Sequence, residues 1–406
     1  MNARYDALIV GGGPSGATAA ILLARAGWSV AVLERKVFPR GKVCGEYLSA
    51  TNRPLLQELG LARCFESDGG PEVRRVGLFA GRHCVEAPLA HPSGGWGRAW
   101  PRTDLDTRLL HEAEAAGADV IQPAVVTRVD TFATRQSAEV RESNWSVRKI
   151  HATIVIGAHG SWDTGTLPTQ PGRRRCRAGD LLAFKAHFRG HALCNDLMPL
   201  VCFPGGYGGM VNCGHDCLSF SLCIRRDRLS QIRGHEKNAG IAILRYVMEN
   251  CVGVRRVLQN AALEDGWLAA GPIRPGIRLP RHDEYFAIGN AAGEAHPVVA
   301  EGISMSLQSA WLLSGLLVEW RRSGADRKQL HRVQAEYARS WRKAFAMRVW
   351  TAAAVAHWAM RPLAVRSVLP LLRACPALLT MGSRWSGKST MVQPASSRLV
   401  AEKSPA

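Results

Sequence analysis

Tyr5-Asp6-Ala7-Leu8-Ile9-Val10 and the adjoining Gly11-Gly12-Gly13-Pro14-Ser15-Gly16 decide the fold of this chain. The apolar run predicts a buried β-strand, the glycines a tight turn, and the alanine-rich stretch 17–26 a helix. Residues 29–34 (SVAVLE) predict a second strand that ends on Glu34, 18 residues after the last of these glycines. That is close to the spacing at which a carboxylate binds a ribose, so the whole order predicts a dinucleotide site on a Rossmann-like α/β fold.

Each residue of the glycine turn has a physical role in such a site. Gly11 permits the tight turn, Gly13 lets a pyrophosphate approach the backbone, and Gly16 lets the helix pack closely on the strand. Pro14 and Ser15 open the helix, whose N-terminus carries free N–H groups and about half an elementary positive charge. A phosphate group is therefore expected at this turn.

The composition is that of a globular chain, with one unusual feature, its positive charge. Among 406 residues, 52 Lys and Arg against 33 Asp and Glu give a net charge of +19. Residues 321–406 hold 16 of these cations against 3 acids, a net charge of +13. Because the excess is concentrated in one region, it predicts a local surface property and not a nucleic-acid partner.

The cysteines and the apolar runs bear on the cellular compartment of the protein. Eleven scattered cysteines, an odd number, predict reduced thiols in a cytoplasmic protein. Cys213 and Cys217 lie near His215, but no second ligand pair follows, so small buried side chains are favoured over a zinc site and no metal is predicted. The first apolar run belongs to the strand and not to a signal peptide, and no run of about 18 apolar residues predicts a spanning helix.

Changes in the sequence pattern divide the chain into two interleaved domains and a tail. Residues 181–270 alternate short strands with few long helices, and the strand–glycine–helix passage at 285–293 returns to the first domain. The predicted parts are a nucleotide-binding domain (1–70, 98–180 and 271–330), an inserted, mainly antiparallel substrate domain (71–97 and 181–270), and a basic C-terminal helical cap and tail (331–406).

Three separated passages carry a family resemblance. GGGPSG at 11–16, IGAHGS at 156–161 and IGNAAGEAHPVVAEGISMSLQSA at 288–310 resemble the FAD-dependent oxidoreductases of the geranylgeranyl reductase and aromatic hydroxylase (flavoprotein monooxygenase) superfamily, to which flavoprotein halogenases are related. KVCGE at 42–46 is similar to a stretch that lies beside the flavin in the reductases, and FPGGYG at 203–208 to a substrate-domain loop of that branch. The resemblance implies FAD as the cofactor.

The resemblance also implies most of the FAD-binding residues. Arg102, four residues before Asp106, matches an arginine that family members direct at the cofactor, and the backbone N–H groups of Gly302 and Ile303 are expected near the flavin pyrimidine oxygen. The other cofactor-binding residues that it implies are Glu34, Arg35, Val125, Gly157, Ala158, Gly289, Asn290 and Pro297.

The chain departs from the family pattern at two positions. His159 and Asn290 stand where the family usually has aspartate. Asn290 keeps a carbonyl acceptor for an FAD hydroxyl but loses the charge. A neutral hydrogen bond contributes about 0.5–1.5 kcal/mol against about 1.5–3 kcal/mol for a charged one, so FAD binding is expected to weaken without vanishing.

Three residues are predicted to be catalytic, and each has a structural alternative. Cys44 lies in the flavin-side stretch, but a free cysteine is often only a small buried side chain. His296 can relay protons together with Glu301, or it can hydrogen-bond the backbone while Glu301 caps the following helix. Tyr207 lines the substrate cavity or serves packing alone in its glycine-rich turn.

The predicted function is a redox reaction on an apolar, polyketide- or isoprenoid-like molecule of secondary metabolism. The stretches at 42–46 and 203–208 favour hydride transfer at a C–C double bond; the alternatives are an FAD-dependent monooxygenase that uses NAD(P)H and oxygen, and a non-catalytic flavin- or lipid-binding protein. There is no second glycine motif after a strand, so either NAD(P)H binds only transiently or a partner delivers the electrons. Halogenation is disfavoured because the Trp-x-Trp-x-Ile-Pro stretch of halogenases is missing.

The tail allows two interpretations. Trp341, Trp350, Trp358 and Trp385 alternate with arginines, as suits peripheral binding to an anionic membrane face, and a helical cap over the substrate cavity explains the same residues equally well. GSRWSGKS at 382–389 fits the phosphate-loop pattern, but it follows a helical leucine run and not a core strand, so ATP is not expected.

Overall fold

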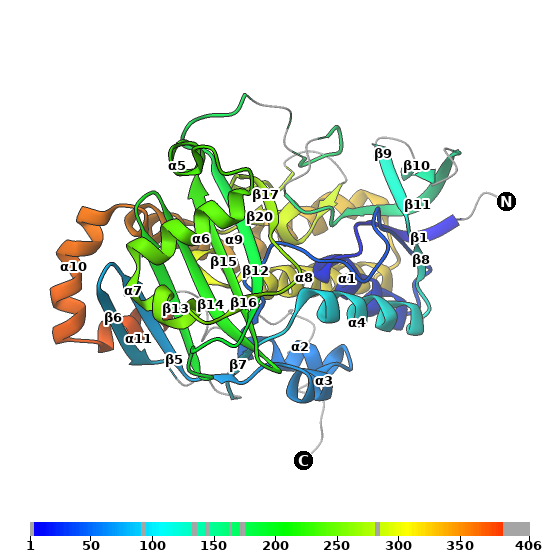
Figure 1. Ribbon diagram of the computed structural model, residues 1–406. Helices are drawn as coiled ribbons and strands as arrows, with labels where there is room; N and C mark the ends of the chain where they lie inside the picture. The colour runs from blue at the N-terminus through cyan, green and yellow to red at the C-terminus, as the bar shows by residue number, and fades with distance from the viewer. Residues whose placement is uncertain are drawn as a thin grey trace, which may run out of the picture.

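The computed structural model describes residues 4–90, 95–131, 136–142, 146–161, 165–170, 172, 175–280 and 285–384. They form two large β-sheets that lie side by side with helices packed against both, plus two small sheets (Figure 1). An α/β nucleotide fold, an inserted, mainly antiparallel sheet and a helical C-terminal region are all present, which confirms the predicted fold class.

The first unit, which we call the nucleotide unit, is built on a mixed seven-stranded sheet. Its strands, in spatial order, are β8 (Asp119–Ile121), β2 (Val30–Leu33), β1 (Arg4–Val10), β11 (Val147–Gly157), β10 (Gln136–Glu142) and β9 (Ala124–Asp130), with β19 (Phe286–Ala287) beside β11. β1 pairs in parallel with β2 and β11, whereas β9, β10 and β11 form an antiparallel meander. The strand predicted from residues 5–10 is β1, which lies inside the sheet between β2 and β11.

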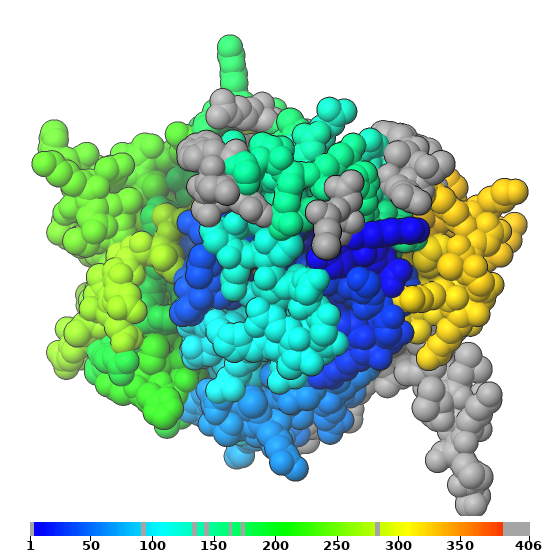
Figure 2. Space-filling view, turned by 90° about the vertical axis from the view of Figure 1, so that its right-hand side faces the viewer, coloured from blue at the N-terminus to red at the C-terminus, as the bar shows by residue number. Residues whose placement is uncertain are grey.

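Burial explains why the opening sequence forms these elements. The last residues of β1 and all of β2 are buried, as expected for parallel strands covered on both faces. Helices α1 (Pro14–Arg25), α4 (Arg102–Ala115) and α8 (Gly302–Arg322) contribute apolar side chains to the same core. In Figure 2, blue β1 and α1 lie beside cyan α4 and the yellow end of α8, where Arg321 pairs with Asp6 at 3.0 Å.

The second unit, which we call the antiparallel unit, is an eight-stranded sheet. Its strands, in spatial order, are β16 (Ala262–Leu263), β12 (Leu181–Arg189), β15 (Cys217–Arg225), β14 (Gly206–Gly214), β13 (Leu197–Phe203), β5 (Arg75–Ala80) and β6 (His83–Pro88), with β17 (Leu268–Ile273) beside β12. Only the β13–β5 pair is parallel. Residues 226–258, where few long helices were expected, fold into α5 (Arg226–Arg233), α6 (Ala239–Asn250) and α7 (Val252–Leu258) over one face.

The C-terminal helices pack on both units. The first half of α9 (Leu330–Ala359) buries Tyr337, Trp341 and Phe345 in the nucleotide unit, and the Tyr337 hydroxyl donates to the Ala287 carbonyl at 2.9 Å. Its end, with α10 (Pro362–Ala374) and α11 (Ala377–Ser383), covers the other face of the antiparallel unit. The domain limits remain a prediction, and no break in packing occurs at residue 331.

Short elements complete the described chain: η1 (Ala50–Asn52), α2 (Arg53–Glu58), α3 (Ala62–Ser67), β3 (Tyr47–Leu48), β4 (Glu72–Val73), β7 (Gly97–Ala99), β18 (Gly276–Ile277), η2 (Gly289–Ala291), β20 (Gly293–Glu294), η3 (Pro297–Val299) and η4 (Arg327–Gln329). Among the described helices none alone has the length and hydropathy to cross a membrane; α10 and α11 meet that test only as a pair, bent by 113°. Most of the stretch 382–389, which fits the phosphate-loop pattern, lies outside the described residues.

Candidate functional site

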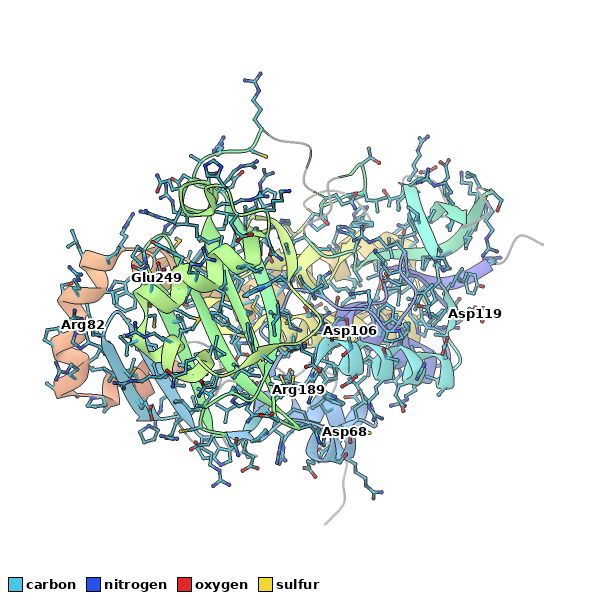
Figure 3. All side chains as sticks on the ribbon, viewed as in Figure 1. Asp68, Arg82, Asp106, Asp119, Arg189 and Glu249 are labelled. Atoms are coloured by element: carbon cyan, nitrogen blue, oxygen red, sulfur yellow. The ribbon has the colours of Figure 1, made fainter. Side chains whose placement is uncertain are left out.

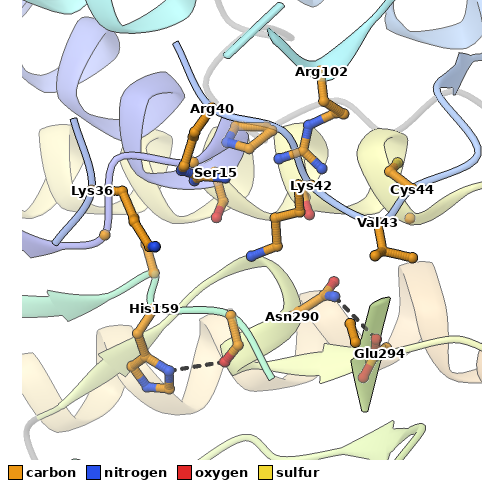
Figure 4. Close-up of a pocket in the computed structure, with 18 of the residues that line it drawn as sticks. Ser15, Lys36, Arg40, Lys42, Val43, Cys44, Arg102, His159, Asn290 and Glu294 are labelled. Atoms are coloured by element: carbon orange, nitrogen blue, oxygen red, sulfur yellow. Dashed lines mark hydrogen bonds between the residues drawn. The ribbon is translucent and has the colours of Figure 1, made fainter. Parts of the chain in front are cut away.

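A cavity of about 810 Å³ lies at the C-terminal ends of β1 and β2, at the head of α1 (Figure 4). Its walls come from separate parts of the chain, within residues 10–15, 33–47, 124–127, 158–160, 165–170, 268–271 and 290–306, together with Arg102. Ligands of open α/β sheets bind at the carboxyl ends of the strands, and these distant segments meet around that position. We call this space the nucleotide cavity.

Most of the residues predicted to bind a cofactor line this cavity. They are Gly11, Gly13, Pro14, Ser15, Glu34, Arg35, Arg102, Val125, Ala158, Asn290, Pro297, Gly302 and Ile303, and the predicted catalytic Cys44 lines it too. The structure therefore brings together residues up to 292 positions apart in the sequence, from Gly11 to Ile303.

Three predicted cofactor glycines do not reach the cavity and serve packing. A Cβ on Gly16 would lie 1.8 Å from the Gly11 carbonyl oxygen, and a Cβ on Gly157 would lie 1.8 Å from the Tyr285 hydroxyl. Gly289 has a φ of +58°, and its Cβ would lie 2.4 Å from the Ser15 hydroxyl. Glycine is required at these positions because backbone and side chains approach too closely for any other residue.

The head of α1 has the geometry of a phosphate site. Gly13 is the N-cap, with a φ of −70° and no side-chain capping bond, so the first N–H groups of the helix face the nucleotide cavity. A Cβ on Gly13 would project into open space, with the Arg40 guanidinium 3.8 Å away as its nearest neighbour. Backbone donors, a helix dipole and a nearby cation together suit a diphosphate.

Arg40 is a cationic residue of the site that belongs to none of the predicted cofactor-binding motifs. Its guanidinium lies 4.5 Å over the Phe38 ring, 3.9 Å from Glu34 and 3.7 Å from Asp106. Burial lowers the pKa of Arg40, but the two carboxylates oppose this, and an arginine stays charged. The only sequence signal was the cluster of basic residues around Arg40 in a glycine-flanked loop, which Figure 4 shows with Lys36 and Lys42 directed into the cavity.

Glu34 is held at the end of β2 as a ribose ligand would be. Its side chain is 5% exposed, and its two oxygens accept from the backbone N–H groups of Gly12 at 2.8 Å and Lys36 at 2.9 Å. A carboxylate has about four acceptor positions, so two such bonds fix its orientation and leave capacity for sugar hydroxyls.

Arg102 is anchored by a buried ion pair. Its Nε and Nη2 donate to the two carboxylate oxygens of Asp106, both at 2.6 Å, and Asp106 is fully buried. Burial opposes the charge, yet the Asp106 carboxylate and Cys44 raise the pKa of Arg102 above its ordinary value. Figure 3 places Asp106 at the end of α4 that faces the antiparallel unit, and Figure 4 shows the Arg102 guanidinium entering the cavity.

Asn290 has a carboxylate neighbour four residues further on. Its amide Nδ2 donates to Glu294 Oε1 at 3.3 Å, and Glu294, which also lines the nucleotide cavity, lies 3.5 Å from the Arg278 guanidinium (Figure 4). The amide orientation is assigned from this bond, which turns Oδ1 away from Glu294. Glu294 therefore positions Asn290 as an acceptor, and it keeps a negative charge close to the position where the family has aspartate.

Restoring aspartate at 290 is expected to weaken FAD binding. In Asn290→Asp, two carboxylates would lie at hydrogen-bond distance and repel each other. In the double variant Asn290→Asp with Glu294→Gln, the new glutamine amide at 294 can donate to the new carboxylate at 290, so the hydrogen bond is restored in the reverse direction. We expect the single variant to lose affinity and the double variant to bind up to about 10-fold more tightly than the wild type, because a charged acceptor replaces a neutral one. Fluorescence titration with FAD measures both; tighter binding by Asn290→Asp alone would refute the positioning role of Glu294.

His159, the second departure, lines the cavity with its ring tied to the backbone. Its Nδ1 is 2.8 Å from the Gly160 carbonyl oxygen and its Nε2 is 3.2 Å from that of Pro168. The His159 ring therefore stabilises the loop between residues 159 and 168. These residues fit FAD. The uncapped N-terminus of α1 and the surrounding cations suit the diphosphate at Gly13–Ser15, Glu34 suits the ribose, and Asn290 offers an acceptor to an FAD hydroxyl.

A second cavity, of about 710 Å³, adjoins the first. Its lining is largely apolar, and we call it the apolar cavity. β5, β13, β14 and β15 form its floor, and the C-terminal helices form its roof, through residues that include Trp358, Leu372, Leu378 and Met381. The tail therefore covers a cavity, as one of its two interpretations expects, while membrane binding stays a prediction.

The two cavities meet at a shared wall. Val43, Cys44, Gly45, Pro297 and Ala300 line both of them. The uncapped N-terminus of α8, with Gly302 and Ile303, opens beside this wall on the nucleotide side. A group bound in the apolar cavity therefore lies next to whatever part of a cofactor reaches the head of α8.

Tyr207 and His296 form a pair at the apolar cavity. Tyr207 lines that cavity, and its hydroxyl lies 3.2 Å from His296 Nδ1, with both side chains buried. Burial, and then the nearby His357 ring, lower the pKa of His296 to about 4. Burial also raises the pKa of Tyr207, so the pair is neutral near pH 7, and neither residue lines the nucleotide cavity.

His296 is expected to make folding stability depend on pH. Its folded pKa lies below the ordinary 6.5, so the unfolded chain binds the proton more tightly, and stability should fall as the pH drops from 6.5 to 4. The loss is at most about 3 kcal/mol. Urea titrations at several pH values should show a smaller loss for His296→Gln and an unchanged one for the exposed control His111→Gln; equal losses in all three would contradict this assignment.

Comparisons with known proteins support the geometry. The family described as "FAD binding domain" matches residues 4–175. A tryptophan 2-halogenase from Chondromyces crocatus is 45% identical over 331 residues, 75% of this chain and 59% of that protein. Digeranylgeranylglycerophospholipid reductase 2 from Methanopyrus kandleri is 25% identical over 321 residues, 75% of this chain and 74% of that protein.

A solved structure shows the same fold. The myxobacterial chondrochloren halogenase superposes with a TM-score of 0.73 at 21% identity, covering 94% of this chain and 90% of its own. For five curated relatives, however, the chain spans less than two thirds of their length, from 29% to 63%.

Proposed function

We propose, since the chain belongs to the FAD-dependent oxidoreductase superfamily, that it is an FAD-dependent enzyme that reduces or forms a C–C double bond in an apolar, isoprenoid- or polyketide-like substrate. The observation that carries the proposal is the wall shared by the nucleotide and apolar cavities at Val43–Gly45, Pro297 and Ala300. The likeness to a digeranylgeranylglycerophospholipid reductase supports a lipid-like substrate.

The residues have distinct tasks in this proposal. The head of α1, with Arg40 and Arg102, binds the diphosphate, and Glu34 binds the ribose. Bound FAD supplies the transfer of a hydride between its ring and the substrate. The apolar lining excludes water from the substrate, and the neutral Tyr207–His296 pair holds a proton at the Tyr207 oxygen within the same cavity. NAD(P)H is the proposed transient electron donor.

Product analysis with and without oxygen tests the proposed reaction. FAD-loaded protein is reduced with NADPH and incubated with polyprenyl lipids and polyketide-type aromatics. Anaerobic saturation of a double bond is the expected result. A product that gains oxygen, formed only in air, would instead establish a monooxygenase, and a product that gains chlorine or bromine would establish a halogenase. Stable FAD binding with no turnover of any class would favour a non-catalytic flavin- or lipid-binding protein.

Filling the apolar cavity tests where the substrate binds. A Cβ on Gly209, which lines this cavity, would make only ordinary contact, 3.5 Å from the Pro199 carbonyl oxygen. Gly209→Leu is therefore expected to fold, to keep FAD affinity, and to raise KM for apolar substrates at least about 10-fold by occupying their space. The matched control is Gly179→Leu, at a position with no neighbour within 4 Å. Unchanged kinetics in Gly209→Leu would place the substrate elsewhere.

A further inference from the structure

A second cluster of polar side chains lies where β12 meets the hairpin of β14 and β15; of its members only Glu46 also lines the nucleotide cavity. The ring nitrogen of His187 and the sulfurs of Cys213 and Cys217 all lie within 4.8 Å of one another. Glu46 Oε2 lies 2.8 Å from His187 Nε2 and 3.7 Å from Cys213 Sγ. Two thiols and an imidazole thus converge on one point, and the Glu46 carboxylate lies beside two of these three groups.

The outer partners of Glu46 are arranged as around a metal ligand. Its other oxygen, Oε1, accepts from the Lys185 ammonium and from the Arg102 backbone N–H at 2.8 Å. Glu46 and Lys185 are 1% and 3% exposed. One carboxylate oxygen is therefore fixed by donors while the other faces the cluster, which is how ligating carboxylates are oriented by their second hydrogen bond.

We propose that Cys213, Cys217, His187 and Glu46 bind a zinc ion. Zinc prefers four ligands of this nitrogen, sulfur and carboxylate type, and its tetrahedral site needs ligand atoms a few ångströms apart. Binding displaces the two thiol protons. The dication, two thiolates, the Glu46 carboxylate and the Lys185 ammonium then sum to no net charge, which suits a largely buried site.

The topology hid this site from the sequence. The cysteines lack a second ligand pair nearby in the chain, and the adjacent His215 lies at the exposed tip of the hairpin. The third and fourth ligands come from β12 and from the loop before β3. His187 and Cys217 are only partly buried, so an ion can enter beside the Arg189–Glu264 pair; Figure 3 labels Arg189.

The zinc ion would fasten the two units to each other. Glu46 follows Val43–Gly45, which form part of the wall between the cavities, whereas the other ligands belong to the antiparallel unit. Binding would therefore fix the flavin-side loop to the sheet that carries the apolar cavity. This inference is independent of the proposed reaction, because it concerns metal content and stability.

Elemental analysis of the full-length protein, purified with reductant and zinc and without chelator, tests the site. We expect about one zinc per chain in the wild type and in the control Cys375→Ser, and less than about a tenth of that in Cys217→Ser. Lys185→Met should weaken zinc binding about 10–100-fold. Cobalt added to metal-free wild type should give thiolate-to-metal absorption that Cys217→Ser lacks.

Two results would overturn the proposal, and neither depends on a variant folding. The first is wild-type protein that holds no zinc after this preparation and shows no thiolate absorption with cobalt. The second is a Cys213–Cys217 disulfide in freshly isolated protein, detected by alkylation and mass analysis, because oxidised sulfurs cannot serve as these ligands.

Discussion

Gly13→Val should leave a folded protein that no longer retains FAD. The Gly13 φ of −70° is open to any residue, and its Cβ points into the nucleotide cavity, so valine adds bulk only where the diphosphate is expected. Losing two charge-assisted hydrogen bonds of about 1.5–3 kcal/mol each lowers the affinity at least about 100-fold. Flavin absorbance per chain after desalting measures the loss.

Gly179→Val is the matched control for this prediction. Gly179 lies outside both cavities, and a Cβ there has no neighbour within 4 Å. The control should keep all of its flavin, and circular dichroism should show that both variants are folded. Full flavin retention by Gly13→Val would mean that the head of α1 does not bind the diphosphate.

Arg102→Met should be the most destabilising single change at the site. It leaves the Asp106 carboxylate buried without its bidentate partner, with only the Arg40 guanidinium 3.7 Å away. Breaking a buried ion pair in this way costs about 3–5 kcal/mol of unfolding free energy. Urea denaturation measures this loss, and FAD affinity should fall about 10–100-fold as well, because a cation leaves the cavity.

A double variant separates the two roles of Arg102. In Arg102→Met with Asp106→Leu, apolar side chains replace both members of the pair, which is often nearly neutral for stability. We expect most of the unfolding free energy to return while FAD affinity stays low. If FAD affinity also returns to the wild-type value, Arg102 holds α4 in place and does not attract the cofactor.

Local patterns in the sequence were enough to predict the nucleotide side of the site. The strand–glycine–helix order requires a fixed spacing, so the head of α1, Glu34 and the end of β2 could be placed from the chain alone. Gly157 and Gly289 were assigned to the cofactor, whereas the structure uses them for close packing against Tyr285 and Ser15. A glycine motif indicates that another group comes close to the backbone, but the sequence does not show whether that group is a cofactor or a side chain of the protein.

Contacts between distant segments could not be predicted in the same way. Arg40 becomes part of the site only because Phe38, Glu34 and Asp106 hold its guanidinium at the head of α1. The apolar cavity exists only because α9, α10 and α11 return over the face of the antiparallel unit opposite α5, α6 and α7. Neither arrangement leaves a periodicity or spacing in the sequence.

Titration of the flavin-free protein with FAD and, separately, with FMN shows whether the head of α1 and Glu34 hold a flavin dinucleotide. We expect one FAD per chain and much weaker binding of FMN, which lacks the adenosine and the second phosphate that Glu34 and the head of α1 are arranged to hold. No uptake of FAD, or equal affinity for the two flavins, would contradict this expectation.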